Sequence, residues 1–486
     1  MSQDSNLPYD LCIIGAGVVG LNIAREMSRY HLRICVIDKE EDVGRGCTKA
    51  NSGIVHGGYS DEPGTQKAEL CVAGNHLYEQ LDSELHFGYR RTGSLVLAFS
   101  DAEVPTLQKL LEYGRENGVG GLRIIDGEEV RRMEPHLNPA IVAALLCEDA
   151  GVTSPYEFAI ALAENALTNH VDLRLNEEVK TITTSPAGFR VETSRGAVNA
   201  QYIINCAGAN SDRIASMVGV EEYRITPRRG QYVLLDKDQN YLVRSVIFQV
   251  PTKLGKGILV TTTFHGNLMI GPNAEEIDDK SDVGTDLKTL EHIVQQGRRS
   301  VPGFDMRKAL TSFAGNRPVS NQKDWVIGES RVKNFINLIG IDSPGLTASP
   351  AIALKVAGIL KQCGLALEPN PEFQPQRPPI IRKKTADFAG DINAVDPSLH
   401  IICRCEQVTE AEIIDSLNRG ILVRSLDGVK FRTRAGMGRC QGAFCGPRVR
   451  ELLARALSIP PAEVCGKGEC SSNLAERARR SDLFRL

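Results

Sequence analysis

Three glycines near the N-terminus, spaced Gly15-x-Gly17-x-x-Gly20, constrain the fold of this chain more than any other feature. They follow a short apolar run directly, and apolar residues then recur at helical spacing. A second apolar run, residues 33–37, ends at Asp38. Because strand, glycine turn, helix and second strand follow one another within about 30 residues, they form a βαβ unit. The chain therefore begins with a parallel sheet.

This glycine spacing is typical of a dinucleotide site. The first glycine allows a tight turn, the second lets the backbone approach a pyrophosphate, and the third lets the helix pack on the strand. The helix N-terminus offers free N–H groups to the phosphates. Asp38, 21 residues after Gly17, can accept hydrogen bonds from a ribose diol. The βαβ unit alone does not distinguish FAD from NAD.

Four cysteines near the C-terminus form the second strong pattern, Cys403-x-Cys405 followed after 34 residues by Cys440-x4-Cys445. Two close pairs separated by a helical stretch suit a thiolate site, and thiolates are soft ligands that bind zinc or iron–sulfur clusters. Zinc stays an alternative for four thiolates. A chain that binds both a redox nucleotide and a metal cluster is expected to move electrons between them.

Composition limits the remaining classes of function. At 486 residues the chain should hold more than one domain. The net charge of -3 gives no electrostatic case for nucleic acid. No apolar run reaches the ~18 residues of a membrane span, so only peripheral membrane association stays open. The first residues lack the features of a secretory signal, so we expect the 13 cysteines to be reduced thiols and metal ligands in a cytoplasmic protein.

Three further segments, residues 46–58, 202–209 and 340–347, point to the nucleotide. With the glycine turn they resemble the flavoprotein family of D-amino-acid oxidase and FAD-dependent glycerol-3-phosphate dehydrogenase over residues 8–365. The last segment precedes a helix predicted over 350–362, whose N-terminus would place positive potential near a flavin. The resemblance implies tightly bound FAD. The FAD-binding residues that it implies are Gly15, Gly17, Gly20, Asp38, Thr48, Asn51, Ser52, Gly53, Val179, Ala207, Gly208, Gly345, Leu346 and Thr347.

The segments around the C-terminal cysteines are similar to bacterioferritin-associated-ferredoxin-like modules, which carry a 2Fe–2S cluster. The cluster ligands that this resemblance implies are Cys403, Cys405, Cys440 and Cys445. The whole chain resembles the large subunits of anaerobic-type glycerol-3-phosphate dehydrogenases, with a flavin domain, a linker and this module in order. That resemblance implies a second redox subunit or an electron carrier as the partner.

We therefore expect an α/β protein with a Rossmann-like FAD-binding domain, an antiparallel-sheet substrate domain and a small helical iron–sulfur domain. The expected boundaries are 1–366 for the flavin region, 367–396 for a proline-rich linker, 397–457 for the cluster domain and 458–486 for a tail. Within the flavin region we expect FAD-binding parts at about 8–75, 145–215 and 330–366, and substrate-binding parts at about 76–144 and 216–329.

An anionic small molecule is the expected substrate. In the family it lies over the flavin, and a carbon-bound hydrogen leaves as hydride to flavin N5 while a base takes the hydroxyl or amine proton. Arg317 matches the family's substrate-anion arginine, whose planar fork suits carboxylate or phosphate. His56 and His265 are candidates for the base, although a structural role is as well supported for each. Further candidates for binding the anion are Lys49, Lys253 and Lys256.

The leading expectation is oxidation of sn-glycerol 3-phosphate to dihydroxyacetone phosphate. One position departs from the family pattern, because glycerol-3-phosphate dehydrogenases place an arginine about six residues before the histidine that matches His56. Here that position is Ala50, beside Lys49. Lysine can replace the charge but not the bidentate geometry. This departure keeps an L-2-hydroxy-acid dehydrogenase (2-hydroxyglutarate-like) open. An amino-acid dehydrogenase and an electron-transfer subunit without its own substrate are further alternatives.

Overall fold

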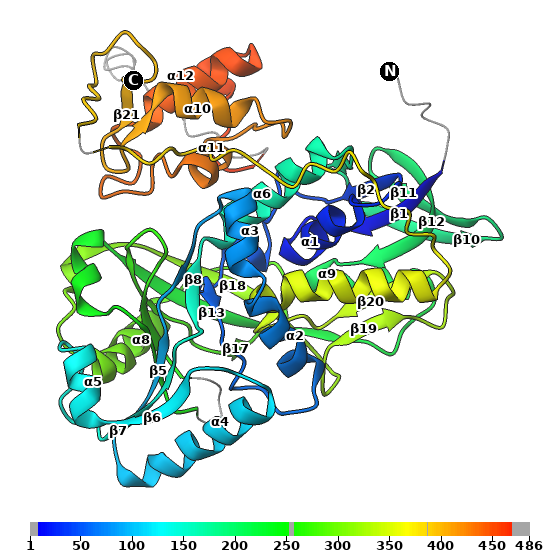
Figure 1. Cartoon of the computed structure of the whole chain (residues 1–486). Coiled ribbons are helices and arrows are strands. Elements are labelled where there is room, and N and C mark those ends of the chain that lie inside the picture. The colour runs from blue at the N-terminus through cyan, green and yellow to red at the C-terminus, as the bar shows by residue number, and fades with distance from the viewer. Residues whose placement is uncertain (1–7, 252–256, 386, 469–486) are drawn as a thin grey trace, which may run out of the picture. The chain divides into compact units, whose positions relative to one another are not determined.

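The computed structural model describes residues 8–251, 257–385 and 387–468, and the chain divides into two compact units between Pro378 and Pro379 (Figure 1). We call them the N-terminal unit and the C-terminal unit. Within the described parts of the chain, none of the helices has the length and hydropathy that a membrane span needs.

The first sheet of the N-terminal unit is built around the predicted βαβ unit. Its strands are β1 (Tyr9–Ile14), β2 (Ile34–Ile37), β9 (Asp172–Arg174), β10 (Val179–Ser185), β11 (Gly188–Thr193), β12 (Gly196–Asn205), β19 (Val326–Glu329) and β20 (Phe335–Ile339). The order is β10-β11-β12-β1-β2-β9, with β20 paired to β12 and to β19. Because β1 pairs in parallel with both β2 and β12, the ends of these strands meet at one edge of the sheet.

Helices cover this sheet. Its principal helices are α1 (Val18–Met27), α6 (Pro155–Thr168) and α9 (Gly345–Gln362), and α1 packs against the other two (Figure 1). The sequence predicted that α9 begins at residue 350, which is wrong, since the helix begins five residues earlier, at Gly345. Pro350 lies inside the helix and cannot donate to the carbonyl of Leu346. That carbonyl instead accepts a hydrogen bond of 2.6 Å from the Tyr78 hydroxyl, so the helix continues through the proline.

The second sheet forms the predicted substrate region. Its strands are β5 (Ser94–Ala98), β6 (Leu122–Asp126), β7 (Ala143–Cys147), β13 (Ile225–Leu235), β14 (Val246–Gln249), β15 (Leu259–Thr262), β16 (Leu268–Gly271), β17 (Glu275–Glu276) and β18 (Ala309–Ser320). The order is β17-β13-β16-β15-β14-β5-β7-β6, with β18 paired to β13. The sheet is antiparallel except where β14 pairs in parallel with β5. Alternate residues of β5 enter two different apolar clusters, so both faces of the sheet are buried there.

Shorter elements complete the N-terminal unit. A small sheet contains β3 (Ile54–Val55), β4 (Tyr89–Arg91) and β8 (Gly151–Thr153). The other helices are α2 (Gln66–Asn75), α3 (Tyr78–Leu85), α4 (Val104–Glu116), α5 (Gly127–Met133), α7 (Ser211–Ser216) and α8 (Leu287–Ser300), with 3₁₀ turns η1 (Cys47–Lys49) and η3 (Gly208–Asn210) among others.

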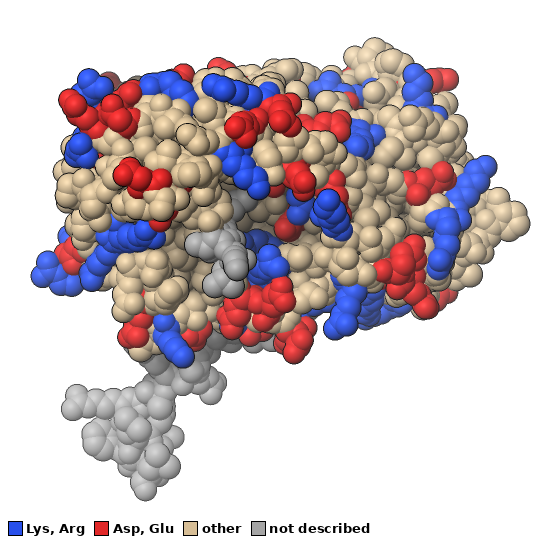
Figure 2. Space-filling model, turned by 90° about the horizontal axis from the view of Figure 1, so that it is seen from below, with Lys and Arg blue, Asp and Glu red and all other residues tan. Residues whose placement is uncertain are grey.

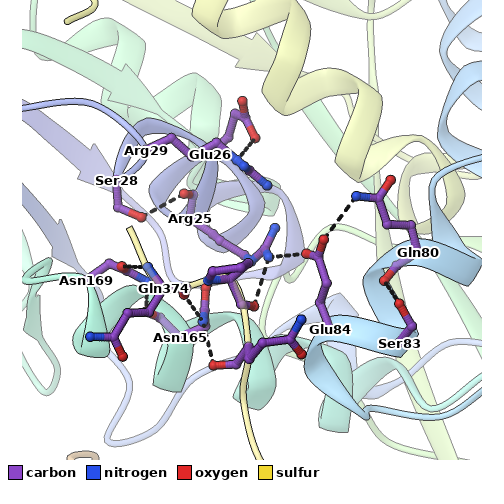
Figure 3. Close-up of polar contacts among 12 residues, drawn as sticks. Arg25, Glu26, Ser28, Arg29, Gln80, Ser83, Glu84, Asn165, Asn169 and Gln374 are labelled. Carbon is purple, nitrogen blue, oxygen red and sulfur yellow. Dashed lines mark hydrogen bonds and ion pairs between the residues drawn. The ribbon is translucent and has the colours of Figure 1, made fainter. Parts of the chain in front are cut away.

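The proline-rich segment that follows α9 is bound to the N-terminal unit as far as residue 378. We call residues 369–378 the strap. The side-chain amides of Asn165 and Asn169 each donate to the carbonyl of Gln374 at 2.9 Å, and Arg25 donates to the carbonyl of Pro375 (Figure 3). The strap begins with an isolated antiparallel bridge between Pro369 and Tyr30. Beyond it, side chains of α1 and of the C-terminal end of α6 donate to the strap carbonyls of residues 374 and 375.

Buried charges fasten the strap further. Arg377 is 7% exposed and donates to Glu164, which is 4% exposed, at 2.7 Å. Arg25 forms a second buried ion pair with Glu84 of α3 (Figure 3). The expected linker, 367–396, is therefore not one uniform spacer, since its first part packs on the N-terminal unit and the rest belongs to the C-terminal unit. The proline content of this segment predicts that it is stiff, but it does not reveal the side chains that donate hydrogen bonds to the strap.

The C-terminal unit is small and mainly helical, as predicted. Its elements are β21 (Ile401–Cys403), β22 (Val408–Thr409), α10 (Glu410–Leu417), α11 (Leu426–Thr433) and α12 (Gly446–Leu457). A reciprocal capping box between Thr409 and Glu412 starts α10. Apolar side chains from all three helices form its own core.

Candidate active site and cluster site

The glycine turn brings β1, α1 and the end of β12 into close contact. Gly15 has a φ of +115°, and a Cβ there would lie 2.4 Å from the carbonyl oxygen of Cys206. A Cβ on Gly20 would lie 2.1 Å from the carbonyl oxygen of Gly15. Ala207 and Gly208 follow directly, and the φ of Gly208 is +56°. Gly15 and Gly20 need glycine because a Cβ at either position would clash with the backbone, whereas at Gly208 only the positive φ favours glycine.

The N-terminus of α1 is open to an anion. Gly17 provides no side-chain cap, and the first turn has no acidic residue. The N–H of Val18 donates to Thr48 Oγ1 at 3.0 Å, which ties η1 to this helix end. The other N–H groups of the first turn have no partner within the helix itself, and such groups bind phosphate.

Asp38 lies at the end of β2, beside this turn. Its carboxylate accepts hydrogen bonds from the backbone N–H of Ala16 at 2.7 Å and of Glu40 at 2.9 Å. Burial nevertheless raises the pKa of Asp38 to about 6. Its carbonyl accepts from the N–H of Glu177, close to the start of β10 at Val179. The Val179 side chain packs in the core under the sheet, so only its backbone could face a nucleotide.

The N-terminus of α9 is tied to the segment that follows η1. Thr347 Oγ1 accepts a hydrogen bond from the N–H of His56 at 2.9 Å and donates to the carbonyl of Ile54 at 3.2 Å. This helix end also lacks a side-chain cap and an acidic first turn. Gly345, Leu346 and Thr347 form its first three residues. The positive end of the helix dipole therefore lies beside the residues around His56.

Asn51 shapes the segment between η1 and β3. Its side-chain amide donates to the carbonyl of Thr48 at 2.8 Å, and its oxygen accepts from the N–H of Gly53 at 2.8 Å. Gly53 has a φ of +64°, and a Cβ there would lie 2.6 Å from the carbonyl oxygen of Thr153. This turn of Asn51, Ser52 and Gly53 is therefore held by the main chain and one amide side chain.

The predicted nucleotide residues thus combine two uncapped helix N-termini, glycine backbone and one carboxylate. This donor set fits FAD, with α1 for the pyrophosphate, Asp38 for the ribose and the α9 N-terminus for the flavin. When bound, FAD supplies a two-electron acceptor that can pass electrons on singly. The individual contacts remain predictions.

Arg317 lies on β18 and is half-buried. Its guanidinium donates to the carbonyl oxygens of Asn273 at 2.7 Å and Arg228 at 3.3 Å. Among the residues that the structure describes, Arg317 has no carboxylate within 4.0 Å. A held guanidinium with an uncompensated charge is what binding of a carboxylate or phosphate requires.

Glycine lets the η1 region lie directly against this strand. Gly315 is two residues from Arg317, and a Cβ there would lie 1.9 Å from the carbonyl oxygen of Ala50. Ala50, where the family pattern has arginine, is therefore adjacent in space to the strand that carries Arg317. Lys49 is half-buried at the end of η1. Lys253 and Lys256 lie outside the described residues.

Two aromatic residues beside Arg317 were not foreseen. Tyr232 of β13 pairs in register with Phe313 of β18, and their rings stack with centroids 4.7 Å apart. Burial raises the pKa of Tyr232, whose hydroxyl also contacts Ser52. Phe313 and Arg317 are four residues apart on one strand and so share a face. That period of two was available in the sequence and could have identified Phe313.

The structure separates the two candidate bases. His56 is half-buried, stacks on Phe248 with centroids 6.0 Å apart, and has its backbone bonded to the first turn of α9. His265 lies in the turn between β15 and β16, where its Nε2 is 2.9 Å from Glu157 Oε1. A carboxylate at a ring nitrogen can orient a catalytic histidine as well as hold a structural one, so this contact does not decide. The backbone of His56 is bonded to the helix end expected at the flavin, which favours His56 as the base, and the assignment remains a prediction.

The four C-terminal cysteines come together in two pairs. The thiols of Cys403 and Cys445 lie within hydrogen-bonding reach of each other, and so do those of Cys405 and Cys440. The contact with Cys445 lowers the pKa of Cys403 to about 6. Backbone N–H groups of the loop, first that of Phe444, lower the pKa of Cys440. The contact with Cys403 raises the pKa of Cys445, so Cys403 and Cys440 are the thiols whose surroundings favour the thiolate, the form that binds metal.

Two pairs of thiols match the ligand set of a 2Fe–2S cluster, in which each iron takes two protein ligands. Zinc would take the same four thiolates around one ion, so the thiols alone leave both metals open.

Comparison with known families agrees with this geometry. Residues 10–359 match the model of the FAD dependent oxidoreductase family, and residues 401–455 match that of the BFD-like 2Fe-2S binding domain. The chain belongs to the FAD dependent oxidoreductase family. Its cofactors are FAD and a 2Fe–2S cluster, and the zinc alternative is set aside.

Three relatives illustrate the range of this family. The chain is 46% identical to a glycerol 3-phosphate dehydrogenase of Caloramator mitchellensis, over 94% of this chain and 96% of that one. It is 30% identical to the mitochondrial L-2-hydroxyglutarate dehydrogenase of Arabidopsis thaliana, over 72% and 82%. The dithionite-reduced L-alpha-glycerophosphate oxidase of Mycoplasma pneumoniae with FAD bound superposes with a TM-score of 0.73 at 29% identity, covering 76% and 98%.

Proposed function

We propose that this oxidoreductase oxidises sn-glycerol 3-phosphate to dihydroxyacetone phosphate and passes the electrons through its 2Fe–2S cluster to a partner. The substrate assignment rests on Arg317, whose positive charge has no carboxylate partner among the described residues and which lies on the strand next to η1. The Caloramator mitchellensis dehydrogenase supports it further, because the resemblance extends through both units.

The residues of the chain divide the work of this reaction. Arg317 would hold the phosphate with two parallel N–H donors and thereby orient carbon 2 of the substrate. His56 would take the proton of the carbon 2 hydroxyl while the hydrogen on that carbon leaves as hydride to the flavin. The stacked rings of Tyr232 and Phe313 would exclude water from one side.

An L-2-hydroxy acid is the second candidate substrate. Its carboxylate would suit Arg317 equally, and Ala50 stands where a phosphate-binding arginine is expected. The likeness to an L-2-hydroxyglutarate dehydrogenase over 72% of the chain favours the same reading. The two candidates differ in the anion that Arg317 would bind and in the size of the molecule.

An anaerobic substrate screen that follows flavin bleaching tests the proposal. Glycerol 3-phosphate should bleach the flavin faster than L-2-hydroxyglutarate, lactate or amino acids. Bleaching by L-2-hydroxyglutarate but not by glycerol 3-phosphate would replace the first candidate with the second. Failure of every substrate would favour an electron-transfer subunit instead.

The acceptor and the compartment are also part of the proposal. We propose a second redox subunit or an electron carrier as the acceptor, because a cluster is not needed to transfer electrons to oxygen. None of the 12 cysteines among the described residues forms a disulfide, which is consistent with the reducing cytoplasm that we expect.

A further inference from the structure

An aromatic ring lies at the surface beside the cluster ligands. Phe444, next to Cys445, is 40% exposed. The guanidinium of Arg404 lies over its ring at 4.5 Å from the centroid, and that of Arg448 at 4.9 Å. Arg404 stands between two cluster ligands in the sequence, and Arg448 is in the first turn of α12. We call these three residues the exit patch.

The thiolates of the cluster site lie close to the exit patch in the sequence, but no carboxylate of the described residues neutralises its positive charge. Among the described residues, neither Arg404 nor Arg448 has a carboxylate within 4.0 Å. Glu406, the acidic residue nearest to Arg404 in the sequence, is engaged by Arg434 at 2.9 Å. Arg448 also has one buried nitrogen without a hydrogen-bond partner. The N-terminus of α12, which has no acidic residue in its first turn, adds further positive potential.

The sequence around the exit patch also has a positive net charge. Residues 401–468 contain 11 basic and 7 acidic residues. Between Asp427 and Glu451 the chain has no acidic residue. The basic residues in that interval are Lys430, Arg432, Arg434, Arg439, Arg448 and Arg450. On the face of the molecule in Figure 2, by contrast, acidic and basic side chains are interspersed.

We propose that the exit patch docks an acidic electron-carrier protein against the 2Fe–2S cluster, an inference that rests on the proposed flow of electrons through the cluster. An exposed aromatic ring flanked by arginines is the composition of an interface hot spot. Uncompensated positive charge steers an acidic partner and suppresses basic ones. Because Phe444 adjoins Cys445 and Arg404 lies between Cys403 and Cys405 in the sequence, docking there places the carrier beside the cluster.

The electrons balance for a one-electron carrier. Each substrate molecule gives up two electrons and two protons as its alcohol becomes a ketone. The cluster passes one electron at a time, so two carrier molecules are each reduced by one electron per substrate. The carrier is the oxidant, and no other co-reactant is needed.

The N-terminal unit and an anionic membrane could compete for the same patch. The rest of the chain is acidic overall, since the whole chain has a net charge of -3. The N-terminal unit, however, is tethered to the patch by the chain, so its effective concentration is already high and electrostatic steering adds little to its rate of association. A free carrier protein gains much more from steering. The composition of the patch therefore favours a free protein partner, and the test below includes both competitors.

Cytochrome c in two charge forms provides matched probes, because the native protein is basic and the succinylated protein is acidic. The fully loaded protein is photoreduced, and the reduction of each probe is followed at low and high salt. Calorimetry with oxidised protein measures binding separately. We expect the acidic form to bind and to be reduced about tenfold faster than the basic form, with the advantage lost at high salt.

Substitutions then locate the surface. Arg404→Gln with Arg448→Gln should remove the preference for the acidic probe, and Phe444→Ala should weaken binding without changing its salt dependence. Arg455→Gln, at the exposed far end of α12, makes the same charge change and should leave binding unaltered. Iron content and the spectrum of the cluster are measured for each variant.

Several outcomes would overturn the inference. One is equal binding of both probes to the unaltered protein, which requires no variant. Another is slower electron transfer from flavin to cluster in the arginine variants, which would assign the patch to the N-terminal unit. A third is that the double arginine variant no longer binds vesicles of anionic phospholipid but still binds the acidic cytochrome c as the unaltered protein does. That result would assign the patch to a membrane. Photoreduction keeps the test independent of the substrate, so failure of glycerol 3-phosphate to bleach the flavin would be recognised separately.

Discussion

The two units hold their cofactors by different means. In the N-terminal unit the predicted FAD residues are mostly glycine backbone and helix ends, assembled from segments as far apart as Gly15 and Thr347. In the C-terminal unit four cysteine side chains within 43 residues form the site. A main-chain site depends on exact packing of the fold, whereas a side-chain site depends on a few atoms. The same kind of substitution should therefore have different effects in the two units.

The largest expected effect is at the side-chain site. Cys440→Ser should abolish the cluster, because a serine oxygen is a poor ligand for iron–sulfur clusters. Iron and acid-labile sulfide should fall from about two each per chain to near zero. Substrate should still bleach the flavin, since α1, α9 and Arg317 belong to the other unit. Loss of FAD in the same variant would contradict the independence of the two sites.

Arg317→Ala tests the one side chain on which the N-terminal unit is expected to depend. The substrate concentration for half-maximal flavin bleaching should rise roughly 10²-fold, because hydrogen bonds to charged groups contribute ~1.5–3 kcal/mol. Bound FAD should not change. Arg228→Ala on the paired strand is the control, because Arg228 is already neutralised by Glu276 at 2.8 Å. Equal effects of the two substitutions would remove Arg317 from the substrate site.

Gly20→Ala tests the main-chain site itself. The added carbon would lie 2.1 Å from a backbone oxygen, so α1 must shift away from β1. Such overpacking costs ~1–3 kcal/mol, and we expect FAD affinity to fall about tenfold. Gly358→Ala, in α9, is the matched control, because a Cβ there meets nothing within 4 Å. FAD released on denaturation and measured by fluorescence decides between these outcomes.

The smallest effect concerns pH. Burial raises the pKa of Asp38 to about 6 in the chain without nucleotide, so below pH 6 this carboxyl is mainly protonated. Hydrogen bonds from a ribose favour the ionised form, and binding must then release a proton. FAD affinity should therefore fall by up to about tenfold per pH unit below pH 6. Asp38→Asn should bind FAD more weakly at neutral pH and lose this dependence, as fluorescence titration at pH 5 to 7 would show.

The sequence predicted the features that local chemistry dictates. The βαβ unit follows from short spacings, and the structure has it where the sequence placed it. The four cysteines lie together in the C-terminal unit, but they contact one another across the two sequence pairs, Cys403 with Cys445 and Cys405 with Cys440. The start of α9 was wrong because a hydroxyl from Tyr78, distant in sequence, replaces the bond that Pro350 cannot make. Likewise, the stacking of Tyr232 on Phe313 and the role of Glu157 beside His265 depend on long-range pairing. Such contacts carry no local signal in one sequence.

The strap has a practical consequence for dissecting the molecule. A recombinant fragment that ends at residue 366 would remove the partners of Asn165, Asn169 and Glu164, and would leave buried polar groups without hydrogen bonds beside the helix that begins the nucleotide site. A fragment that ends at 378 keeps all of them. Proteases that require a mobile substrate should also spare the strap, despite its resemblance to an exposed hinge. The boundary at which this protein divides in two, after Pro378, therefore lies well beyond Gln362, where the last helix of the N-terminal unit ends.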